Sequence, residues 1–136
     1  MNIEKAVLRE NPDLQESQKI IMDGLSQKRT LIIAGSCNVR YQGRASSTLQ
    51  QGERIVIVKE DGNLLIHRPY ALEPVNYMPS TSRDEQAKPS SIRKTGGSFF
   101  EVRGDEESLT LRAVRKEIRE TITVTFNRIH ALMSLA

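Results

Sequence analysis

Apolar and polar residues alternate along much of this chain, a pattern typical of half-buried β-strands. The clearest run covers residues 121–126, where three apolar residues alternate with three threonines. Residues 31–41 alternate in the same way, with Cys37, Val39 and Tyr41 on one side. Successive side chains of a strand point to opposite faces of its sheet, so each run offers one face to a core. Further strands are expected at residues 54–59, 64–68, 99–103 and 109–113. The pattern therefore predicts a mainly β domain.

Turn and loop signals separate these strands. Asp61-Gly62 is a strong hairpin signal between two apolar runs. The polar run from Gly43 to Gly52 is expected to form a loop, and a bulge is expected at Gly35. Two prolines stiffen a second loop, which delivers Asn76, Tyr77 and Met78. Short strands are thus expected to carry polar and aromatic residues at their ends.

Helical spacing is expected at three places. Asn11-Pro12 resembles a cap followed by proline at the first helical position, and it predicts a helix over residues 12–28 that covers the sheet. Residues 2–10 also have a helical spacing. Ile129, Leu132 and Met133 form a stripe that predicts a short C-terminal helix. These elements divide the chain into an N-terminal helical extension, residues 1–29, and a β-rich domain, residues 30–136.

Residues 79–98 differ in composition from the rest. They hold prolines, glycines, several serines and mixed charges, which predict a long mobile loop. Its four basic residues are interpreted as solvated rather than as ligands of nucleic acid.

Composition excludes several classes of function. The single cysteine, Cys37, excludes an internal disulfide and fits a reducing compartment, and with only His67 and His130 a zinc site is not expected. An apolar run of membrane-spanning length and a signal peptide are both missing from the sequence, so a cytoplasmic protein without membrane contact is expected. The acidic residues are scattered rather than clustered as a magnesium nuclease requires, so no catalytic centre is predicted.

The positive charge is concentrated in the middle of the chain. The net charge is only +3, but residues 28–59 hold six basic residues against one acid, Glu53. This distribution favours a polyanionic partner, although a solvated strand face would have the same composition. Aromatic side chains at strand ends beside cations suit single-stranded or flipped-out bases, which stack on rings while the cations hold phosphates.

One ordered string of residues resembles a known family, the N-terminal domain of the NucS/EndoMS endonucleases, which cut mismatched and branched DNA. The matching positions are Cys37, Val39, Tyr41, Gly43, Arg44, Ala45, Ser47, Leu49, Gly52, Arg54, Lys59, Asp61, Gly62, His67, Arg68, Pro69, Pro74, Val75 and Asn76. Residues 111–115 and 119–120 resemble later strands of that domain. The resemblance implies a half-open β-barrel or sandwich that dimerises and binds single-stranded, mismatched or branched DNA.

Roles for individual residues follow from the resemblance alone. It implies that Tyr41 and Tyr77 stack on a flipped base, with Tyr77 replacing the usual tryptophan, and that Met78 replaces a usual glutamine. It implies that Leu49 wedges into the duplex. The remaining implied DNA contacts are Arg44, Arg68, Lys59 and Asn76.

The resemblance also implies what lies elsewhere in the family. The nuclease carboxylates, their Mg²⁺ and the sliding-clamp contact belong to regions beyond the part matched here, so this chain is expected to be non-catalytic and to hold no cofactor. A homodimer is expected, formed by apolar faces of the C-terminal strands, unless those faces fill the protomer's own core. The residues in question are Leu109, Leu111, Ile122, Val124 and Phe126. The alternative function is a protein-interaction and dimerisation module that does not bind nucleic acid.

Overall fold

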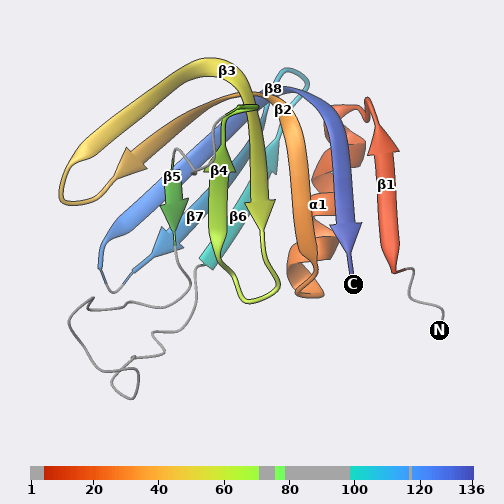
Figure 1. The fold of residues 1–136 in the computed structure, drawn as a ribbon, viewed down its shortest axis with the longest axis horizontal. Helices are drawn as coiled ribbons and strands as arrows, with labels where there is room; N and C mark the ends of the chain where they lie inside the picture. Colours follow the sequence, from red (N-terminus) through yellow and green to blue (C-terminus); the bar gives the residue numbers. More distant parts are fainter. Residues whose placement is uncertain (1–4, 71–75, 79–98, 117) are drawn as a thin grey trace.

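A computed structural model describes residues 5–70, 76–78, 99–116 and 118–136. These residues form one helix and an eight-stranded antiparallel sheet that curls into a half-barrel (Figure 1). The strand order is β5-β4-β3-β2-β8-β7-β6, and β1 pairs with β8. The elements are β1 (Ala6–Glu10), α1 (Leu14–Ser26), β2 (Thr30–Gln42), β3 (Ser46–Val58), β4 (Leu64–His67), β5 (Asn76–Met78), β6 (Phe99–Gly104), β7 (Leu109–Arg115) and β8 (Glu120–Leu135). The expected mainly β half-barrel with a helix is confirmed.

The long strands β2 and β8 form the centre of the sheet, and bulges bend them. The pairing register of β8 against β2 shifts twice, between Ala34 and Gly35 and between Ser36 and Cys37. The register of β3 against β2 shifts between Cys37 and Val39. Each bulge adds a residue to one strand and increases its bend, so three bulges in one region curl the sheet. The irregularity predicted at Gly35 is present, but the extra residue lies in β8, opposite Gly35, and not in β2 as predicted.

The helix fills the inside of the curved sheet. Asp13 caps α1, since its side chain accepts a hydrogen bond of 2.7 Å from the backbone N–H of Glu16. The helix packs against β6, β8 and β2, and its Ile21 is fully buried. It approaches β2 closely, because a Cβ on Gly24 would lie 2.6 Å from Leu31 Cδ2. The predicted helix that covers the sheet is confirmed, but the cap predicted at Asn11-Pro12 was wrong, because α1 begins at Leu14 and Asp13 is its N-cap.

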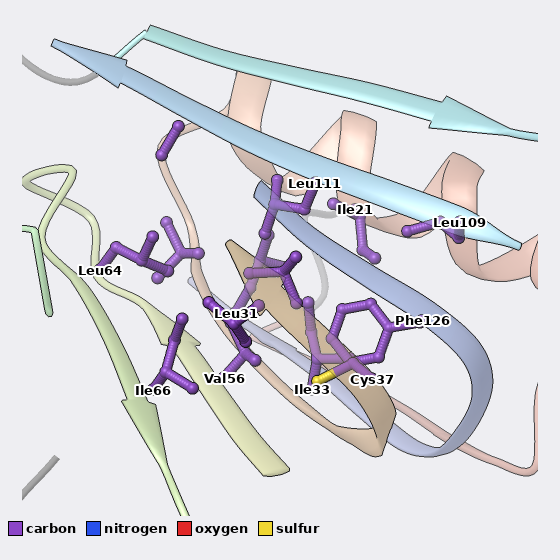
Figure 2. Packing of buried hydrophobic residues seen from close by; sticks show 14 of the residues in the cluster. Ile21, Leu31, Ile33, Cys37, Val56, Leu64, Ile66, Leu109, Leu111 and Phe126 are labelled. Carbon is purple, nitrogen blue, oxygen red and sulfur yellow. The ribbon is translucent and has the colours of Figure 1, made fainter. Parts of the chain in front are cut away.

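The core lies between α1 and the inner face of the sheet (Figure 2). Cys37 is part of it and pairs across the sheet with Phe126, whose ring is the largest buried side chain. All five residues considered for a dimer surface are 0% exposed: Leu109, Leu111, Ile122, Val124 and Phe126. Because these residues stabilise the protomer itself, the prediction that they form the dimer surface was wrong.

Two predicted helices are strands. The helix predicted over residues 2–10 was wrong where the structure describes it, because β1 pairs with residues 131–135 of β8. The short C-terminal helix was also wrong, since β8 continues to Leu135. Its helical spacing comes from the two bulges in β8, which move the buried positions to Phe126, Ile129 and Leu132. A spacing of three in a bulged strand resembles that of a helix.

Strand β3 begins earlier than the sequence suggests. The polar run expected as a loop belongs to it from Ser46 onward and pairs with the end of β2. The Asp61-Gly62 turn is confirmed, because the Gly62 N–H donates to the Lys59 carbonyl at 2.9 Å and Gly62 has a φ of 88°. The loop predicted over residues 79–98 lies outside the described residues. Among the described residues, no helix is long and apolar enough to cross a membrane.

Candidate nucleic-acid interface

Tyr41 lies on the inner face at the far end of β2. It pairs with Ile122 and Ser47 and packs, half-buried, against the core. Its hydroxyl lies beside the Glu120 side chain, because a Cβ added to Gly43 would collide with the hydroxyl oxygen and lie 3.2 Å from Glu120 Cγ. Burial and the Glu120 carboxylate raise the pKa of Tyr41, while the Arg44 charge opposes the rise. The ring is therefore held in one orientation at the rim of the core.

Two other predicted residues share the end of the β2–β3 hairpin with Tyr41. Arg44 is exposed in the turn, which the Gly43 N–H closes by donating to the Ala45 carbonyl at 3.2 Å. Leu49 pairs with Val39 and packs, half-buried, against the core. It lies within β3 rather than in a loop as expected, because the polar run before Gly52 is a strand. The structure thus brings Tyr41, Arg44 and Leu49 to one end of the sheet.

Lys59 lies at the opposite end of β3. It is exposed in the β3–β4 turn and lines a hollow together with Lys28 and Arg29, which lie between α1 and β2. Glu60 and Asp61 line the same hollow and offset this positive charge. Lys59 is not part of the group around Tyr41.

The remaining predicted residues belong to the β4–β5 side of the sheet. Arg68 is exposed and directly follows His67, whose partner across the sheet is Ile55. In β5, Tyr77 pairs with Leu65 and Asn76 with Ile66. From Tyr77 and Leu65, the row of paired residues continues to Ile57 in β3 and to Ile32 near the start of β2. Tyr41 lies near the end of β2 (Figure 1). The backbone register thus places the two tyrosines in different rows of the sheet.

Arg54 is a cation of the inner face that our assignment of sites from the sequence did not include. It pairs with buried Gly35, and its guanidinium lies over Gly52, whose added Cβ would come within 2.6 Å of Arg54 Nη1. Nη1 donates to the Glu53 carbonyl at 2.9 Å and Nη2 to the Gln50 carbonyl at 3.3 Å. The spacing Gly52-x-Arg54 could have indicated this contact from the sequence, because residues two apart in a strand lie on the same face of the sheet.

A network of polar side chains spans the bulges on the outer face. Gln51 Nε2 donates to Ser36 Oγ at 2.8 Å and to Asn127 Oδ1 at 3.0 Å, and Asn38 Nδ2 donates to Gln51 Oε1 at 3.3 Å. Beside it His130 Nε2 lies 2.9 Å from the Glu53 carboxylate. These hydrogen bonds join β2, β3 and β8 at the positions where their pairing registers shift. They therefore stabilise the bend between the two ends of the sheet.

The outer face also carries a continuous row of apolar residues across five strands. Leu65, Ile57, Ile32, Met133 and Leu8 are successive partners from β4 to β1. The first four are half-buried and Leu8 is 54% exposed. Directly paired residues share a face of the sheet, so this outer apolar row is one surface.

The described residues contain no group of three or more His, Cys, Asp or Glu side chains that could hold a metal ion. Cys37 is fully buried, and this burial raises its pKa to about 12. A thiol with such a high pKa is a poor nucleophile. The interpretation of Cys37 as a small buried hydrophobic residue is confirmed.

Comparisons with known proteins give one consistent result. Residues 27–135 match the family described as the endonuclease NucS N-terminal PH-like domain. Endonuclease NucS of Pyrococcus furiosus is 36% identical over 76% of this chain and 36% of its own length. Endonuclease NucS of Methanocaldococcus jannaschii is 32% identical over 96% of this chain and 43% of its own length. The chain therefore spans less than half the length of these relatives.

Solved structures agree in fold. An EndoMS–dsDNA2 complex matches with a TM-score of 0.80 and 28% identity, over 98% of this chain and 49% of that chain. A repair endonuclease from Pyrococcus abyssi matches with a TM-score of 0.71 and 28% identity, over 96% of this chain and 49% of that chain.

Proposed function

Since the chain belongs to the endonuclease NucS family, as its N-terminal PH-like domain, we propose that it is a non-catalytic DNA-binding and dimerisation domain. The preferred DNA is single-stranded, mismatched or branched. We propose that this domain needs no cofactor, and that Mg²⁺, strand cleavage and a sliding-clamp contact belong to other parts of the longer relatives.

The observation that carries the proposal is the grouping of Tyr41 and Arg44 at one end of the sheet. A half-buried ring has one face against the core and one edge or face open to a ligand, and the ring lies between Gly43 and the Glu120 side chain. A base stacked on such a ring gains roughly 1–3 kcal/mol. Arg44, exposed in the adjoining turn, supplies a cation for a neighbouring phosphate.

The other predicted contacts extend this site by proposal. Arg68 is exposed and follows His67, the partner of Ile55, so it lies at the strand position next to Arg54 and adds a second cation. Leu49 shares the hairpin with Tyr41 and wedges beside the extruded base. Asn76 contacts the DNA from β5, and Lys59 contacts more distant DNA backbone at the other end of β3. Because Tyr77 pairs with Leu65 at the end of the outer apolar row, its contact with DNA is proposed to be separate from that of Tyr41 and to lie at the edge of the dimer contact. Extruding a base costs a few kcal/mol and least at a mismatch or in a single strand, which gives the preference for such DNA.

Dimerisation is proposed through the outer apolar row. A contiguous exposed apolar surface commonly marks an association site. A second copy of this chain brings the same row, so a two-fold axis across the row pairs apolar side chains with apolar side chains. The end of the sheet that carries Tyr41 and Arg44 remains open to DNA in that arrangement.

DNA titration tests the proposal against the alternative of a pure interaction module. Fluorescently labelled single-stranded, mismatched and fully paired DNA of equal length are titrated with the chain at two salt concentrations. Binding that weakens with salt and favours the first two DNAs supports the proposal. A dimer that binds none of the three DNAs supports the alternative. Cleavage of any of them by this chain with Mg²⁺ would contradict its non-catalytic role.

A further inference from the structure

Arg54 is a partly buried cation without a carboxylate partner among the described residues. The inner-face neighbours of its strand position are Gly35 and the core residue Val56, and its charge acts on the buried Cys37 thiol. The adjacent acid, Glu53, pairs instead with His130 on the outer face. Burying a charged group without a partner costs free energy, so the presence of Arg54 at this position requires an explanation.

The hydrogen bonds of Arg54 are incomplete. Its two terminal nitrogens donate to neutral carbonyls of its own strand, at 2.9 Å and 3.3 Å. Its Nε is buried and is without a hydrogen-bond partner in the described part of the chain. Buried donors are nearly always satisfied, and an exception indicates strain or a missing ligand. The guanidinium is therefore folded back in a resting position that leaves its binding capacity unused.

Gly52 makes this resting position possible. A Cβ there would come within 2.6 Å of the guanidinium, so only glycine lets Arg54 lie across the strand. The guanidinium is the terminal part of a flexible side chain, so it can turn away from Gly52 without movement of the backbone. When it turns, Nε and one terminal nitrogen become available together, which is the arrangement that binds a phosphate through two hydrogen bonds.

We propose that Arg54 binds a backbone phosphate of the nucleic-acid strand that enters the inner face, and that this phosphate displaces the guanidinium from its resting position over Gly52. Ile55, the residue after Arg54, pairs with His67, and Arg68 follows His67. Arg54 and Arg68 therefore lie next to each other on adjacent strands, and both cations face the incoming anion. The inference rests on the proposed DNA-binding function and adds a contact between the Tyr41 group and Arg68.

The test uses two variants of the chain with opposite expected effects. Arg54→Met keeps the length of the side chain but removes the charge and the donors. It is expected to weaken binding of single-stranded DNA by about tenfold or more at low salt, and to lower the slope of log affinity against log salt by about 0.7. Gly52→Ala displaces the guanidinium in advance, so it is expected to bind the same DNA as tightly as the parent or more tightly.

Thermal unfolding of the same proteins separates binding from folding. Arg54→Met is expected to unfold at or above the parent's temperature, because an unsatisfied buried donor is lost. If folded Arg54→Met binds DNA with the parent's affinity and salt slope, the inference is wrong while the proposed function stands. A weaker Gly52→Ala with full thermal stability would contradict displacement from the resting position. If the parent itself binds no DNA, both proposals fail.

Discussion

The Tyr41 hydroxyl lies beside the Glu120 side chain, at the point where the end of β2 meets the beginning of β8. Strand β8 carries Glu120 next to the turn after β7, and β2 carries Tyr41 next to the turn before β3. This contact therefore places the ring next to both turns at this end of the sheet. Arg44 lies in one of these turns, and its charge acts on the same hydroxyl.

Removal of the Tyr41 hydroxyl is expected to have a small effect on folding. Tyr41→Phe keeps the ring and its packing and loses only the polar contact with Glu120, so the free energy of unfolding is expected to fall by about 1 kcal/mol or less. Denaturant titration measures this value, and Glu120→Gln serves as a control because it keeps a polar side chain of the same shape beside the hydroxyl. A loss of several kcal/mol in Tyr41→Phe would contradict a minor role of the hydroxyl in folding.

Stability is expected to fall at high pH because of Cys37. Its pKa is raised from 9.0 to about 12 in the folded protein, so its contribution is complete below pH 9 and is lost as pH rises from 9 towards 12. Between pH 8 and pH 10 the loss from this thiol is about 1 kcal/mol. Chemical denaturation at both pH values is the measurement. The Cys37→Ala variant should lose less stability over the same interval, and an equal loss would contradict this assignment.

Two glycines are expected to differ in their tolerance of alanine. At Gly35 a Cβ would collide with the Arg128 carbonyl oxygen and lie 3.1 Å from the Phe126 ring, and neither backbone nor core can yield cheaply. Gly35→Ala is therefore expected to lower the free energy of unfolding by about 2 kcal/mol or more. At Gly104 the nearest atom belongs to the flexible Gln18 side chain, so Gly104→Ala should cost under 1 kcal/mol. Equal costs in thermal unfolding would argue against the bulge as the cause.

Dimerisation is expected to depend on the outer apolar row. Ile57→Glu places a charge in the middle of that row, so sedimentation equilibrium at about 100 micromolar should show a monomer where the parent is a dimer. Thr123→Glu is the matched control, because Thr123 lies on the same outer face between Arg40 and Arg112, away from the row. A parent that is monomeric, or an Ile57→Glu variant that remains a folded dimer, would contradict this interface.

Much of the fold could be predicted because alternation is a local property of the sequence. It located the strands around Cys37, Val56 and Val124, and the Asp61-Gly62 turn fixed one hairpin. The errors arose where alternation was interrupted. Bulges in β8 gave Ile129 and Leu132 a helical spacing, and only the pairing with β2 and β1 shows that they belong to a strand.

The site was predictable in part for a similar reason. Tyr41 and Arg44 are close in sequence and remain close in the fold, so one stretch of chain was enough to group them. Lys59 is also near in sequence, yet the length of β3 carries it to the opposite end of the sheet. Arg54 was overlooked because its unsatisfied Nε and its position over Gly52 depend on how the inner face packs.

The central claim is that DNA binds by stacking an extruded base on Tyr41, and a comparison of Tyr41→Ala with Tyr41→Phe tests it most directly. The parent, both variants and Arg44→Ala are titrated with single-stranded, mismatched and paired DNA, and thermal unfolding confirms that each protein is folded. Tyr41→Ala should lose roughly 5- to 150-fold in affinity for the first two DNAs, while Tyr41→Phe keeps the parent's preference. Arg44→Ala should weaken binding to all three DNAs and reduce the salt dependence by about one phosphate contact. If folded Tyr41→Ala distinguishes the three DNAs just as the parent does, the account is contradicted.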